Sequence, residues 1–180
     1  MNLKRLVIAW TIAVLILTQP GFAQQRKVIE FTGSGVPQPN PVPVRGLVRC
    51  EGADNPSPAD KDMPPWCPAG TITTVVGRIV VGKWATSDAN TTGDIRWYMY
   101  FNVDSATFTG PWWGSFILNI PGKGFWEGSF FGEMTTGLST HRLIGIGHGA
   151  FEQCTLMAEI SFEDGKPATF SGRYLEPKNP

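Results

Sequence analysis

Residues Asp94 to Val103 read Asp-Ile-Arg-Trp-Tyr-Met-Tyr-Phe-Asn-Val, and two kinds of side chain alternate along them. One set is hydrophobic and consists of Ile95, Trp97, Met99, Phe101 and Val103. The other set carries a polar atom in every side chain and consists of Asp94, Arg96, Tyr98, Tyr100 and Asn102. Successive side chains of a strand point to opposite faces, so this stretch predicts a strand with one face in the core.

Further runs with this two-residue period lie at 72–85, 113–120, 125–134, 140–147, 150–162 and 168–175. Turn-forming sequences rich in Gly, Asp, Asn and Pro separate them, at 88–93, 109–111, 121–124, 135–137 and 163–166. No segment combines a helical period with a helix cap. We therefore expect an all-β protein, a single antiparallel β-barrel of about eight strands, with a sandwich as the alternative.

A recurring Gly-x-aromatic pattern favours the barrel over the sandwich. It occurs at Gly82-Lys83-Trp84, Gly114-Ser115-Phe116, Gly128-Ser129-Phe130, Gly149-Ala150-Phe151 and Gly172-Arg173-Tyr174. A glycine inside a strand permits sharp coiling and leaves room for a neighbouring ring. The pattern bears on architecture and carries no information about function.

The chain changes character at about Gly70. Residues 33–68 contain nine prolines, which fix φ and remove backbone donors, whereas none follows residue 71 until Pro111. We expect residues 24–70 to be a Pro-rich N-terminal extension that contributes little to the core, with short strands at 27–31 and 44–48. The β-barrel domain is then predicted to span 71–177.

Residues 1–23 have the layout of a secretory signal peptide. Lys4 and Arg5 precede an apolar run from Leu6 to Leu17, and Pro20 and Gly21 follow before Ala23. A helix of that run would be about 18 Å long, too short for a hydrocarbon core of about 30 Å. We expect a secreted or periplasmic protein with no stable membrane anchor after cleavage. Loss of Lys4 and Arg5 leaves 13 basic against 15 acidic residues, a net charge of −2.

Export makes a disulfide possible for the three cysteines. Cys50 and Cys67 flank a polar, Pro-containing stretch, and we expect them to form the disulfide of a loop stabilised by about 3 kcal/mol. Cys154 falls in a strand-like run and is expected to stay reduced and buried. No CxxC pair exists and the chain has two histidines, so no metal site is expected.

Overall composition excludes one broad class of function. Lys and Arg number 15 and are balanced by 15 acidic residues, without the basic clusters that neutralise nucleic-acid phosphates. We expect no nucleic-acid partner. The 42% hydrophobic content is enough for one domain with a core. No nucleophile elbow, phosphate loop or HExxH motif occurs, and we expect no cofactor.

Residues 142–156, Arg-Leu-Ile-Gly-Ile-Gly-His-Gly-Ala-Phe-Glu-Gln-Cys-Thr-Leu, resemble a strand pair of the allene oxide cyclase and dirigent type of barrel. In that family the pattern is Gly-x-Gly-x-Phe-Glu-Gly, and here Gln153 replaces the final glycine. The resemblance covers about residues 110–175. It implies an eight-stranded antiparallel barrel around a mainly apolar cavity. The catalytic residues of the plant cyclases have no counterpart here, so the resemblance implies no activity.

Candidate site residues follow from the strand alternation. Trp126, Phe130 and Met134 share a face with two glycines, so we expect this face to line an apolar pocket, with Phe116 and Phe151 nearby; plain core is the alternative. Candidates for acid-base chemistry are Glu127, Glu133 and His148. An inward Glu would have a raised pKa and could act as an acid or base, whereas an outward one would only aid solubility. His141 and His148 are expected on opposite faces.

Three functions are consistent with these features. Binding of a small apolar or aromatic ligand ranks first, because it requires a lined cavity but no catalytic residues. An isomerase or cyclase without a metal is the second, and a filled barrel serving as a structural or protein-interaction module is the third. A cavity of about 300 Å³ or more would favour the first two. Asn90 begins a glycosylation sequon in a predicted loop, which matters only in a eukaryotic host.

Overall fold

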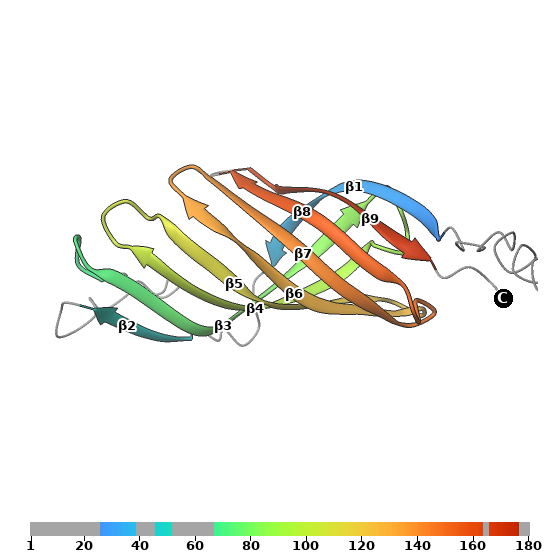
Figure 1. Ribbon diagram of the computed structural model, residues 1–180, viewed down its shortest axis with the longest axis horizontal. Helices are drawn as coiled ribbons and strands as arrows, with labels where there is room; N and C mark the ends of the chain where they lie inside the picture. The colour runs from blue at the N-terminus through green and yellow to red at the C-terminus, as the bar shows by residue number, and fades with distance from the viewer. Residues whose placement is uncertain (1–25, 39–45, 52–66, 164–165, 177–180) are drawn as a thin grey trace, which may run out of the picture.

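The computed structural model describes residues 26–38, 46–51, 67–163 and 166–176, and these form nine β-strands and no helix (Figure 1). The strands are β1 Lys27–Gln38, β2 Leu47–Glu51, β3 Ile72–Thr86, β4 Gly93–Asp104, β5 Gly110–Ile120, β6 Gly124–Thr135, β7 Leu138–Gly149, β8 Thr155–Glu163 and β9 Ala168–Glu176. All pairings are antiparallel. The expected all-β fold is confirmed. The proposed leader, residues 1–23, lies outside the described residues.

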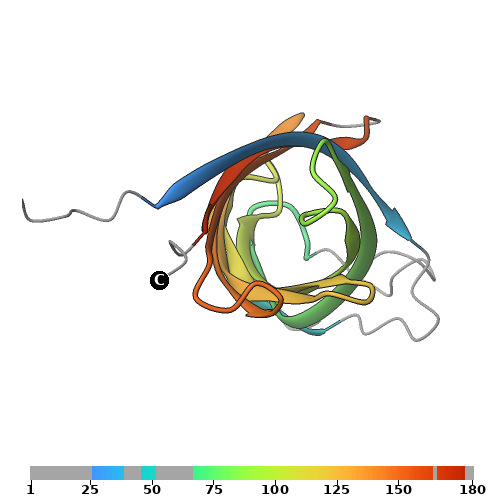
Figure 2. The same cartoon turned by 90° about the vertical axis from the view of Figure 1, so that its right-hand side faces the viewer.

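The strands close into a ring of eight. Each strand from β3 to β9 pairs with the next along the chain, and β1 pairs with β9 on one side and with β3 on the other (Figure 2). β1 pairs with residues 81–86 of β3, and β2 pairs with residues 72–76 of the same strand. β1 and β2 therefore occupy successive lengths of one edge of β3.

The closing strand corrects the expected domain boundary. Residues 27–38 were predicted to belong to an extension with little core, but β1 completes the ring and its Phe31 is 2% exposed in the core. The physical reason is that a meander of β3 to β9 alone would leave two open sheet edges. β1 covers both edges. The short strand expected at 27–31 is present as part of the longer β1, whereas β2 overlaps the strand expected at 44–48 only at residues 47 and 48; residues 44 and 45 lie outside the described part of the chain.

Glycines on the inner face make room for rings from neighbouring strands. A Cβ at Gly172 would lie 2.6 Å from the ring of Phe31, and one at Gly35 would lie 2.7 Å from the ring of Phe170. Aromatic side chains thus fill space that the glycines leave empty. The core includes stacked Trp84 and Phe170, whose ring centroids are 4.3 Å apart.

A β-bulge at Gly77 changes which residues of β3 face inward. Gly77 has a φ of +74°, which is unfavourable for other residues, and the register with β4 shifts between Val76 and Arg78. Val75 pairs with the inward Phe101 before the bulge, and Arg78 pairs with Met99 after it. The extra residue therefore turns Arg78 toward the barrel interior.

The cysteines are arranged as expected. Cys50 of β2 forms a disulfide with Cys67, which precedes β3, and Cys154 is free and buried. A structural disulfide indicates an oxidising, non-cytoplasmic compartment. In the part of the chain that the structure describes, no helix could cross a membrane.

Candidate functional site

The two ends of the barrel differ in how they are filled. At one end, here called the closed end, lie the β3–β4 loop (87–92), the β5–β6 turn (121–123) and the β7–β8 loop (150–154). At the opposite end, called the cavity end, lie the β4–β5 loop (105–109) and the β6–β7 turn (136–137). Figure 2 looks onto the closed end, where the β3–β4 loop lies over the ring.

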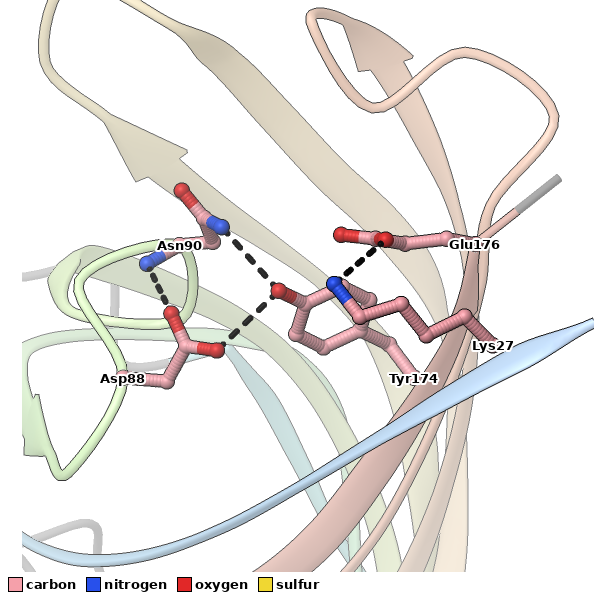
Figure 3. A network of polar contacts seen from close by, with 5 residues as sticks. All are labelled: Lys27, Asp88, Asn90, Tyr174 and Glu176. Carbon is pink, nitrogen blue, oxygen red and sulfur yellow. Dashed lines mark hydrogen bonds and ion pairs between the residues drawn. The ribbon is translucent and has the colours of Figure 1, made fainter. Parts of the chain in front are cut away.

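Hydrogen bonds fasten the β3–β4 loop to the closed end (Figure 3). The Tyr174 hydroxyl donates to Asp88 Oδ2 and accepts from Asn90 Nδ2, each at 3.0 Å. Trp126 Nε1 donates to the carbonyl of Asn90 at 2.8 Å, and Lys123 Nζ donates to Asn90 Oδ1 at 2.7 Å. Burial raises the pKa of Tyr174 to about 12, so its hydroxyl stays protonated. Both polar atoms of the sequon residue Asn90 are thus engaged in holding the loop.

Aromatic rings pack tightly beneath this loop. Trp126 is fully buried and stacks on Phe151, with ring centroids 4.9 Å apart and an interplanar angle of 19°. Its ring also lies 5.4 Å from that of Tyr174. The closed end is therefore a packed and fully hydrogen-bonded plug.

A cavity of about 290 Å³ lies in the other part of the interior. Its wall is mostly aromatic and aliphatic: Trp84, Trp97, Phe101, Trp112, Phe162 and Phe170 supply rings, and Val80, Ile95, Met99, Met134 and Ala168 supply aliphatic surface. Arg78 and Lys83 are the charged residues of the wall. Other hollows are grooves on the outer face, lined by outward residues such as Ile144 and Glu159.

Of the five predicted pocket residues, one lines the cavity and four lie in the packed core. Trp126, Phe130, Phe116 and Phe151 point inward as expected, but all four are at most 4% exposed in the packed core and are absent from the cavity wall. Met134 does line the cavity. Four of the five residues are therefore core residues, which was the alternative interpretation. Neighbouring side chains leave no free space beside them.

Two polar side chains near the cavity lack hydrogen-bond partners among the described residues. They are Trp112, through its Nε1, and His141, through both ring nitrogens. The His141 ring is 2% exposed and lies 4.3 Å from the ring of Trp112 and 5.4 Å from that of Phe162. Burial lowers the pKa of His141 to about 4, so the imidazole is neutral near pH 7. It then offers one donor and one acceptor.

The predicted acid-base residues lie on the outer face instead of in the interior. Glu127 and Glu133 share a face of β6 with the 66%-exposed Phe131, opposite to the inward Trp126. His148 Nε2 lies 2.9 Å from Glu127 Oε1, and the His148 ring stacks on Phe125. The hypothesis of an inward Glu is therefore wrong, since β6 keeps its alternation without a break. His141 and His148 do lie on opposite faces of β7.

Sequence reasoning missed that Arg78 and His141 are titratable side chains that face inward. The inward position of Arg78 could have been found from the sequence. Val75 and Trp84 are both typical inward residues, but they are an odd number of positions apart, so a strand that contains both must have a bulge between them. His141 was hidden because Ile144 and Ile146, on the outer face of β7, are more apolar than the glycines inside.

Comparison with known protein families, with curated proteins and with solved structures found no match. Among the described residues, no group of three or more His, Cys, Asp and Glu side chains is placed to hold a metal ion.

Proposed function

We propose that this protein is an exported β-barrel that binds a small apolar or aromatic molecule in its interior. The observation that carries the proposal is the cavity of about 290 Å³, close to the smallest size of known ligand sites, in a barrel whose other end is filled. A wall of rings with few polar groups suits an apolar guest.

Export to a secreted or periplasmic location is part of the proposal. The signal-peptide layout of residues 1–23 and the disulfide of Cys50 with Cys67 support it. The resemblance of residues 110–175 to allene oxide cyclase and dirigent barrels supports the interior as the binding place. The third function, a filled structural barrel, is less compatible with an open cavity.

Titration with the neutral fluorescent probe N-phenylnaphthylamine tests the proposal. We expect saturable binding that weakens at least tenfold in Ala168→Leu, because the added side chain enters the cavity. Val80→Phe serves as a second filling variant in case Ala168→Leu unfolds. Phe131→Ala is the matched control, since Phe131 is exposed on the outer face. Probe binding that is lost in Phe131→Ala but kept in both filling variants would place the probe outside and reject the proposal.

An isomerase or cyclase is the second candidate, and the inward imidazole of His141 is the observation that favours it. A neutral imidazole in an apolar interior can take up and return a proton. His141→Gln should then abolish turnover of any converted ligand while leaving probe binding intact. Conversion that persists in this variant would reject His141 as the acid-base group.

A further inference from the structure

Arg78 is a cation in the cavity wall for which the described residues supply no counter-ion. The bulge at Gly77 turns it inward, beside Met99 and among the apolar lining. Among the residues that the structure describes, no carboxylate forms an ion pair with Arg78 and no group forms a hydrogen bond with its guanidinium. Burial lowers the pKa of Arg78, but arginine remains protonated near pH 7. An uncompensated charge against apolar surface is unfavourable, so the site is incomplete as it stands.

Lys83, the other cation of the wall, provides a comparison within the same strand. Its Nζ lies 4.0 Å from Asp94 Oδ1, and both side chains are about 60% exposed on the outer face. Lys83 is therefore solvated and has a nearby acid. Arg78 is only partly exposed and has no acid within ion-pair distance among the described residues, so it is the cation whose charge a ligand would balance.

We propose that the cavity binds a small amphipathic monocarboxylate, with its carboxylate on Arg78 and its apolar body among the aromatic rings. This inference rests on the proposed function and adds the chemical class of the ligand. The planar guanidinium fork matches a carboxylate in two parallel hydrogen bonds. One negative charge balances the single charge of Arg78, whereas a phosphate dianion would leave an excess. The free Nε1–H of Trp112 offers a donor to a further oxygen on the ligand body.

Displacement of bound N-phenylnaphthylamine by naphthoate and by naphthamide tests the proposal, because the two competitors have nearly the same shape and differ in charge. We expect the wild-type protein to prefer naphthoate by about tenfold to a hundredfold, the range of a charge-assisted hydrogen bond. Arg78→Met should abolish this preference while N-phenylnaphthylamine still binds. Arg78→Lys should retain part of it, and the control Arg96→Met, at an exposed position on the outer face of β4, should retain all of it.

The outcomes separate this inference from the proposed function. If N-phenylnaphthylamine does not bind the wild-type protein, the proposed function fails. If the probe binds but Arg78→Met keeps the preference for naphthoate, the carboxylate assignment fails alone. Tighter binding of naphthyl phosphate than of naphthoate would also overturn it. A marked fall in the denaturation midpoint of both Arg78→Met and Arg78→Gln would show that Arg78 serves the fold, and would overturn the proposal.

Discussion

The two ends of the barrel differ in whether a buried tryptophan has a hydrogen-bond partner. At the closed end, Trp126 donates to the carbonyl of Asn90. At the cavity end, Trp112 has no acceptor for the same indole nitrogen. Among the described residues, the buried side-chain polar atoms without a partner belong to Asn102, Trp112 and His141, and none of these lies at the closed end. Native structures pair almost all buried polar groups, so the unpaired Nε1 of Trp112 in the cavity wall is a donor that the proposed ligand could satisfy.

Packing shows the same difference. Stacked rings occur at both ends, as in Trp126 on Phe151 and Trp84 on Phe170, but the rings at the cavity end also surround about 290 Å³ of free volume. Aromatic residues are present at both ends. Substitutions at the closed end should therefore change stability, and substitutions at the cavity end should change binding.

The largest effect is expected from Trp126→Ala. Truncating a buried large aromatic costs about 3 to 5 kcal/mol, and the carbonyl of Asn90 also loses its donor. Chemical denaturation measures the loss in the free energy of unfolding. The folded fraction should bind N-phenylnaphthylamine as the wild type does, and a stable variant with weakened binding would break the division between the two ends.

Acid should destabilise the protein through His141, at the cavity end. Its pKa is about 4 in the folded state and about 6.5 when unfolded, so the unfolded state binds the proton more readily. The contribution of the neutral His141 to the free energy of unfolding should be fully present above about pH 6.5. The free energy of unfolding should fall by about 3 kcal/mol as the pH drops to 4. Denaturation at several pH values measures this slope.

The two histidines supply the control for that slope. His141→Leu should flatten it, and His148→Asn, on the outer face, should leave most of it. If the slope is lost in His148→Asn and kept in His141→Leu, the prediction is wrong, and a group inside the barrel must stabilise the protonated imidazole of His141.

Removing the disulfide tests what holds the cavity end. Cys50→Ser with Cys67→Ser releases β2 from the chain before β3, and closing a loop of this length is worth about 3 kcal/mol in the chain-entropy model. Thermal melting of the double variant should show the loss, and reductant should give the same shift in the wild type. Reductant should still lower the melting temperature of Cys154→Ala, since Cys154 takes no part in the bond. An unchanged midpoint in the double variant would show that β2 is dispensable.

The smallest effect is expected from Tyr174→Phe. The variant loses the hydroxyl that joins Asp88 and Asn90, which should cost about 1 kcal/mol. Tyr100→Phe, on the outer face, is the control and should be neutral. Faster amide hydrogen exchange confined to residues 87–92 would locate the loss in the loop, and exchange spread over the ring would argue against a separate plug.

Much of the fold was accessible from local sequence because each strand from β4 onward keeps its two-residue period between recognisable turns. The disulfide followed from the cysteine positions. Closure of the ring by β1 could not be predicted from local sequence, because it depends on pairing between strands that are far apart in the chain. The prolines near β1 also made this segment look like an extension. The cavity was misplaced for a similar reason: alternation identifies inward side chains such as Trp126 and Met134 equally, but the volume beside each depends on residues from other strands.

Closure of the ring by β1 also governs the order of folding. β1 pairs with β9, so Lys27 must find Glu176 at the far end of the described chain. Contacts between residues so far apart in sequence fold slowly, because loop-closure entropy is lost before the contacts form. The ring cannot be complete until its last strand has been made. Until then β3 and β9 present unpaired edges to other chains, and we expect this interval to be the time of greatest aggregation risk.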